Sequence, residues 1–205
     1  MKKTEATKNI IIESAIKLLR QKGNATVKEI SEDANVNIAA INYHFNDKQS
    51  LMKVVIRRVL ADLKSRIDNF LSAPYSTEAE IKDGIKNFVD DFYRFSIDNI
   101  GIIKYVMIPA NKGLLEMANK YFYSMFSLDS EITYKVITRM NSFGAQHSPE
   151  DLKVKYIMLF SALALPLLFQ LDIKDKRGNS GMFPILNDAS LKDKYVEQLT
   201  KIILG

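Results

Sequence analysis

The chain of 205 residues contains no cysteine and only two histidines, His44 and His147. Without cysteine, the protein has no disulfide bond, no thiol that could act as a nucleophile and no thiolate that could bind a metal. Nothing in the sequence brings the two imidazoles together, so we expect no bound metal and no cofactor. Cysteine-free chains are common in the cytosol, and we expect a cytoplasmic location.

Motifs for catalysis are also missing. The sequence has no phosphate-binding glycine-rich loop, no Gly-x-Ser-x-Gly turn and no cluster of histidines and carboxylates at ligand spacing. The carboxylates of Asp90 and Asp91 are adjacent in sequence, so they point in different directions on a helix. We therefore predict that the protein is not an enzyme, and we name no catalytic residue.

A hydrophobic run long enough to cross a bilayer is lacking. The uncharged stretch 157–171 has 15 residues, against roughly 20 that a membrane helix needs, and Pro166 interrupts it. The N-terminus carries basic residues without a sustained apolar core, which argues against a secretory signal. We expect no membrane association.

The basic residues are concentrated near the N-terminus. Residues 1–66 carry 13 lysines and arginines against 7 acidic residues, a net charge of +6, whereas residues 67–205 carry 16 against 17, a net charge of −1. An excess of positive charge supplies the sequence-independent part of DNA affinity. A solvated helix surface is the alternative use of these lysines.

The segment 26–48 predicts two short helices joined by a tight turn. Thr26 and Glu29 form a capping box at the start of the first helix. Asn35 suits the left-handed conformation of the turn, and Asn37 is a good N-cap for the second helix. Its buried side is expected to contain Ile41 and Phe45. This arrangement is a helix-turn-helix, which ordinarily places its second helix in the major groove of DNA.

With these residues, the segment resembles the N-terminal DNA-binding domain of TetR-family transcriptional regulators. The resemblance rests on Thr26, the sequence Tyr43-His44-Phe45 and Lys48, and it extends over about residues 7–60. Asn35 stands where the family often has glycine, and Asn42 stands where tyrosine is frequent. The resemblance implies an all-α fold, in which residues 1–47 form the DNA-binding domain and residues 48–205 a helical domain for effector binding and dimerisation.

The outward face of the second helix is expected to read base edges. The available side chains are Asn37, Ile38, Ala39, Ala40 and Asn42. Of these, Asn42 can bond an adenine, and Ile38 and Ala39 can contact thymine methyl groups. Phosphate contacts are expected from residues that flank this helix, namely Thr26, Lys28, Tyr43, His44 and Lys48. Three alternatives remain: a core position for Ile38, a structural role for His44 and a merely solvated Lys28.

The rest of the chain shows only helical patterns, with no strand of period two. Further helices are expected at residues 7–22, from Asp47 to Pro74, from Ser76 or Thr77 onward, at 100–109, at 114–141, at 149–171 and at 188–204. Each of the last two helices carries an apolar stripe at a spacing that suits helix–helix packing. The stripe of the first contains Leu152, Tyr156, Leu159, Leu163 and Leu167, and that of the second contains Leu191, Tyr195, Leu199 and Ile202. By resemblance, helices near 149–171 and 188–204 form a homodimer through a four-helix bundle. The alternative is that both stripes pack into their own chain.

By the same resemblance, the C-terminal domain encloses a small-molecule effector. Aromatic and methionine side chains of the middle helices could line its pocket or simply fill a core: Phe88, Phe92, Tyr93, Tyr105, Met117, Tyr121, Phe122 and Met125. We therefore predict a homodimeric repressor that a small molecule releases from a near-palindromic operator in double-stranded DNA. The alternative is a DNA-binding protein of the same fold that responds to a protein partner or to no effector.

Overall fold

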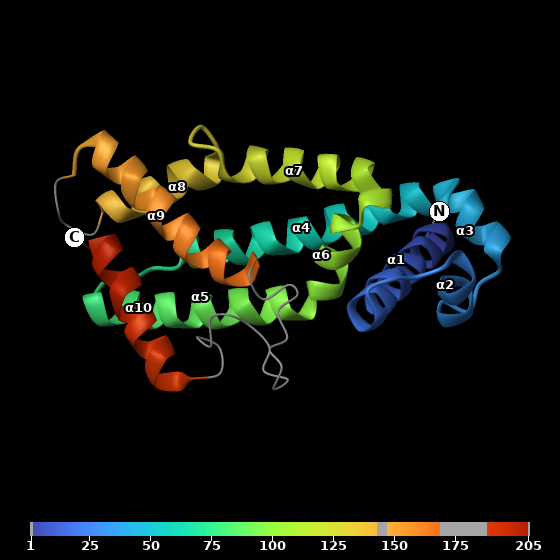
Figure 1. Cartoon of the computed structure of the whole chain (residues 1–205), viewed down its shortest axis with the longest axis horizontal. Coiled ribbons are helices and arrows are strands. Elements are labelled where there is room, and N and C mark those ends of the chain that lie inside the picture. Colours follow the sequence, from blue (N-terminus) through green and yellow to red (C-terminus); the bar gives the residue numbers. More distant parts are fainter. Residues whose placement is uncertain (1, 143–146, 169–187, 205) are drawn as a thin grey trace. The chain divides into compact units, whose positions relative to one another are not determined.

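The computed structural model describes residues 2–142, 147–168 and 188–204 (Figure 1). Every regular element in these ranges is a helix, which confirms the all-α prediction. The elements are α1 (Lys2–Lys22), α2 (Val27–Asp33), α3 (Ile38–Phe45), α4 (Lys48–Ser72), α5 (Glu78–Asp98), α6 (Ile100–Met107), the 3₁₀ turn η1 (Pro109–Asn111), α7 (Lys112–Phe126), α8 (Glu131–Asn141), α9 (Pro149–Leu168) and α10 (Ala189–Leu204). None of these helices is long and apolar enough to cross a membrane.

Most helix ends fall where the local signals predict them. Gly23 ends α1 with a φ of +68°, and its amide bonds the Leu19 carbonyl at 2.8 Å. The prediction for α1 was too short, because the helix begins at Lys2 instead of Thr7. Asp188 caps α10 by accepting a hydrogen bond from the Leu191 amide. Residues 169–171, predicted as the end of a helix, and the predicted loop 172–187 lie outside the described residues.

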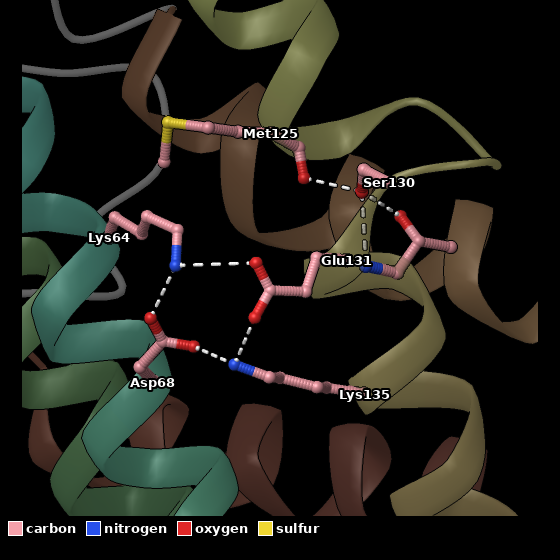
Figure 2. A network of polar contacts seen from close by, with 7 residues as sticks. Lys64, Asp68, Met125, Ser130, Glu131 and Lys135 are labelled. Carbon is pink, nitrogen blue, oxygen red and sulfur yellow. Dashed lines mark hydrogen bonds and ion pairs between the residues drawn. The ribbon is translucent and has the colours of Figure 1, made fainter.

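One long helix predicted at 114–141 is wrong, because the chain forms two helices, α7 and α8, that are separated at residues 127–130. Ser130 is the physical reason. Its hydroxyl donates to the Met125 carbonyl at 2.6 Å and accepts from the Thr133 amide, so it closes the first helix and caps the second (Figure 2). The Thr133 hydroxyl adds a hydrogen bond to the Ser127 carbonyl.

The chain packs as two compact units. Unit 1 comprises residues 1–63 and 97–122, and unit 2 comprises residues 64–96 and 123–205. Helices α4, α5 and α7 therefore each contribute to both units. This division by packing differs from the functional division into residues 1–47 and 48–205, which stays a prediction.

Unit 1 has a continuous apolar core in which α6 packs on α1. Buried side chains of α1, including Ile11, Ala15 and Leu19, share this core with Ile102 and Val106 of α6. At the contact, a Cβ on Gly101 would lie 2.1 Å from the Leu19 carbonyl oxygen, so only glycine fits there. Helix α6 thus belongs to the same packed unit as the helix-turn-helix.

Unit 2 holds a second core, formed by α5, α8, α9 and α10. Tyr93 and Val89 of α5 are buried here with Leu152 of α9 and Val196 of α10. At the start of α8, Asp68 of α4 accepts from Lys64 at 2.7 Å and from Lys135 at 2.8 Å, and both lysines also pair with Glu131 (Figure 2). Four alternating charges therefore tie α4 to α8.

Several members of the predicted packing stripes of α9 and α10 are buried within the chain, whereas Leu191 is 40% exposed. Leu152, Tyr156 and Leu159 are buried in the chain's own core, as is Leu199 of α10. The Tyr195 hydroxyl, also in α10, donates to the Ala162 carbonyl. The buried members favour the alternative that these positions pack within one chain, and dimerisation through the helices near 149–171 and 188–204 stays a prediction.

Candidate nucleic-acid interface and effector cavity

A complete capping box begins α2. The Thr26 hydroxyl oxygen accepts from the Glu29 amide at 3.1 Å, and Glu29 Oε2 accepts from the Thr26 amide at 2.8 Å. Lys22 Nζ lies 3.0 Å from the other carboxylate oxygen. Hydrogen bonding by the Thr26 backbone, followed by Lys22, lowers the pKa of Glu29 to about 2.

The low pKa of Glu29 predicts a pH-dependent stabilisation of α2. Because the pKa in the fold lies below the ordinary value of 4.5, the stabilisation is present above pH 4.5 and is lost as the pH falls toward 2. We expect Glu29→Gln to unfold at a lower urea concentration than the wild type at neutral pH. As the pH falls through this window, the difference between the two urea midpoints should shrink. Urea unfolding of both proteins at a series of pH values checks this, and a difference that stays constant with pH would contradict it.

The turn between α2 and α3 is built by short polar contacts. Asn35 adopts a φ of +50°, as predicted for a tight turn, and the Ser31 hydroxyl donates to the Val36 carbonyl at 2.6 Å. Asn37 caps α3, since its side-chain oxygen accepts from the Ala40 amide at 2.7 Å. A second residue with positive φ, Asn46 at +65°, ends α3 and was not predicted.

Helix α3 has one buried and one exposed side. Ile41 and Phe45 are buried, as predicted, and fix the helix to the core of unit 1. Among the side chains predicted to face base edges, Asn37, Ile38, Ala39 and Asn42 are exposed and Ala40 is half-buried. Ile38 is 46% exposed, so the alternative that it is a core residue does not hold. The exposed side carries amide and apolar groups that suit base edges.

The predicted phosphate contacts lie at the start of α2, in the last turn of α3 and at the start of α4. Tyr43 is 79% exposed, His44 is half-buried beside the Tyr43 and Phe45 rings, and Lys28 is exposed near Glu32. Both donors of Thr26 go to Glu29 in this structure. The predicted phosphate contacts, the structural alternative for His44 and the solvated alternative for Lys28 remain open.

Unit 2 contains a cavity of about 410 Å³, widely open to solvent, which is lined by the end of α4, the following loop and α5. The rings of Phe70 and Phe88 stack in its lining with centroids 4.6 Å apart. Tyr75 covers Gly84, where any side chain would collide with the tyrosine ring. The Arg66–Asp91 ion pair, at 2.6 Å, lies in the same lining.

The residues predicted to contact an effector are spread over both units. Only Phe88 lines this cavity, and Phe92 stacks on it at 5.9 Å. Tyr93 and Met125 are buried in unit 2. In unit 1, Tyr105 is a core residue, Met117 and Tyr121 pack against the core, and Phe122 is 42% exposed. Effector contact by this set stays a prediction, and Phe70 and Tyr75 were not among the predicted residues.

Comparison with known proteins identifies the N-terminal segment. Residues 11–55 match the sequence profile described as bacterial regulatory proteins, tetR family. The probable HTH-type transcriptional regulator YttP of Bacillus subtilis (strain 168) is 45% identical over 53 residues. That match covers 25% of this chain and 26% of the relative, so the two share about a quarter of their lengths.

Solved structures share the fold over nearly the whole chain. A protein assigned to the TetR family of transcriptional regulators in Mesorhizobium loti MAFF303099 aligns with a TM-score of 0.66 and 13% identity, covering 98% of this chain and 96% of that one. SCO7518 of Streptomyces coelicolor A3(2) aligns with a TM-score of 0.60 and 12% identity, covering 97% and 99%. NalD of Pseudomonas aeruginosa, the secondary repressor of the MexAB-OprM multidrug efflux pump, aligns with a TM-score of 0.53 and 15% identity, covering 97% and 96%. At these identities, the likeness establishes the fold.

Proposed function

We propose that the chain, whose residues 11–55 match the TetR family of bacterial regulatory proteins, is a homodimeric transcriptional repressor. In this proposal, the dimer binds a near-palindromic operator in double-stranded DNA and a small molecule releases it. The function consists of binding without a catalytic step. Asp90 and Asp91, the one carboxylate pair that invited an enzymatic interpretation, bind separate partners, Lys192 and Arg66.

The observation that carries the proposal is the two-sided character of α3. Its buried side is anchored by Ile41 and Phe45, while Ile38, Ala39 and Asn42 are presented to solvent. A short helix held in this way is suited to the major groove. The net charge of +6 on residues 1–66 supplies attraction to the phosphates, and a cytoplasmic location is part of the proposal.

Asn42 is the proposed base reader, because its amide can donate to and accept from one adenine. We expect Asn42→Ala to weaken binding to the operator by about 1–3 kcal/mol and to relax the preference at one base position. Binding curves on operator and scrambled duplexes measure this. Asn69→Ala, which removes an exposed asparagine of α4, is the matched control. An equal shift on both DNAs would show that Asn42 does not read a base.

The proposed dimer interface uses a different face of α9 from the predicted stripe. Four apolar side chains are exposed on one side of the helix: Val154, Ile157, Met158 and Leu165. They recur at helical spacing around the small, exposed Ser161, so their side chains form one continuous surface. Leu191 of α10 is 40% exposed. An exposed apolar stripe of this length supports association with a second copy of the chain.

The proposed effector site is the cavity in unit 2. Its stacked phenylalanines and Tyr75 offer apolar contact, while Asp83 and the Arg66–Asp91 pair offer polar groups for orientation. A ligand can release DNA only if it binds the non-DNA-binding conformation more tightly. A DNA-binding protein of the same fold that is controlled by a protein partner, or by no effector, is the second candidate.

Fluorescence anisotropy with DNA fragments that flank the protein's own gene tests the proposed function. Excess nonspecific competitor and a salt series separate operator binding from general attraction to phosphate. We expect one fragment to form a saturable, competitor-resistant complex. Complexes that the competitor abolishes on every fragment would contradict regulation from this locus. The specific complex is then the assay for small molecules that release the protein.

A further inference from the structure

Lys48, the last residue of the helix-turn-helix motif, contacts an aromatic ring outside the motif. Its ammonium nitrogen lies 5.5 Å from the centroid of the Tyr105 ring, which comes from α6. Lys48 is half-buried, and the Tyr105 side chain is only 6% exposed. Among the residues that the structure describes, no carboxylate pairs with Lys48. The ring is therefore the group that holds this ammonium in place.

The position of Tyr105 is fixed by the packing of α6 on α1. Gly101 brings the backbones of the two helices together at the Leu19 carbonyl. Just before α6, the side-chain oxygen of buried Asn99 accepts from Arg20 Nε at 3.1 Å. All of these residues belong to unit 1, so the ring and the ammonium are parts of one packed body.

We propose that Tyr105 is a positioning residue for DNA binding, which holds the Lys48 ammonium ready to contact a DNA phosphate. This inference rests on the proposed function. An aromatic face attracts a cation through its quadrupole and occupies none of its N–H groups. The lysine can therefore rest on the ring and still donate to a phosphate oxygen.

The physical benefit is preorganisation. A free lysine has a flexible stem, whose rotamer freedom is lost when the ammonium binds a phosphate. The Tyr105 ring restricts that freedom before DNA arrives, so less is lost on binding. Because the ring comes from α6, the strength of a contact made by the helix-turn-helix depends on an element outside it.

The test is a double-mutant cycle in the full-length protein. Tyr105→Leu removes the ring but keeps an apolar side chain, Tyr105→Phe keeps the ring, and Lys48→Met removes the charge. The probe is a fluorescein-labelled duplex of mixed sequence, because phosphate contacts do not depend on the bases. Affinity is measured by anisotropy over a series of salt concentrations, with helicity and melting temperature recorded for each variant.

We expect Tyr105→Leu to weaken binding roughly three- to tenfold and Tyr105→Phe to bind like the wild type. Lys48→Met should lower the salt slope by about one, and adding Tyr105→Leu to it should cause no further loss. An equal loss from Tyr105→Leu in both backgrounds, or a loss with Tyr105→Phe as large as with Tyr105→Leu, would overturn the inference. A wild-type protein that does not bind any duplex would instead contradict the proposed function.

A measurement on the unmodified protein covers the case in which Tyr105→Leu does not fold. A methylene group held over an aromatic face experiences the ring current, which moves its proton resonance upfield. We expect the Lys48 Hε resonances of the wild type to be shifted upfield and those of Tyr105→Phe to keep this shift. Resonances at the position of a free lysine would overturn the inference.

Discussion

Ile157→Glu is expected to convert the protein from a dimer to a monomer and to weaken operator binding at least about 100-fold. Ile157 lies in the middle of the exposed apolar face of α9 and is 50% exposed in the single chain. The substitution therefore leaves the fold of one chain intact, but it buries a carboxylate without a partner if two chains meet there. A monomer presents one reading head, so it loses the gain from binding two half-sites together.

Light scattering after size-exclusion chromatography measures the mass, and anisotropy on the operator measures the affinity. The matched control is Tyr134→Glu, which places the same charge at an exposed aromatic residue of α8. We expect the control to remain dimeric with unchanged operator affinity. A dimeric Ile157→Glu protein that binds the operator normally would show that this face of α9 is not the interface.

Gly101→Ala is expected to destabilise the protein by about 3 kcal/mol or more, since it forces a methyl group into a closed contact. The added Cβ would lie 2.1 Å from the Leu19 carbonyl oxygen and 3.1 Å from that of Arg20. Both atoms belong to the backbone of α1, so no flexible side chain can move aside. Relief requires separation of α6 from α1, and with it Tyr105 moves away from Lys48.

Chemical denaturation gives the free energy of unfolding for this comparison. Gly113→Ala is the matched control, because a Cβ at that position meets only the Gln49 side chain at an ordinary 3.5 Å. Alanine also favours a helix over glycine, so the control should be neutral or more stable than the wild type. If Gly101→Ala proves as stable as Gly113→Ala, then α6 and α1 are not held at backbone distance in solution.

The helix-turn-helix could be predicted because its signals are local. The hydrogen bonds between Thr26 and Glu29 and between Asn37 and Ala40 each span three residues. The turn between the helices depends on the backbone conformation of Asn35. Such contacts depend on residue type and spacing, which the sequence displays directly. The same reasoning predicted the buried side of α3 at Ile41 and Phe45.

The break between α7 and α8 shows where local signals compete. The apolar pattern of residues 114–141 is continuous enough to predict one helix, yet Ser130 bonds the Met125 carbonyl and the Thr133 amide. A serine can either continue a helix or cap one. The ion pairs of Lys135 and Glu131 with Asp68 and Lys64 of α4 hold α8 in its place, and these contacts join distant parts of the chain.

By itself, the sequence determined the all-α class, the helix-turn-helix and the residues on its exposed side, because these follow from periodicity and from contacts within one turn. The tertiary structure alone decided which apolar face of α9 is left exposed, since both faces carry apolar residues and periodicity cannot choose between them. It also decided that Gly101 lies against α1 and that Tyr105 lies beneath Lys48. Those contacts join residues far apart in sequence, and only the packing of the core brings them together.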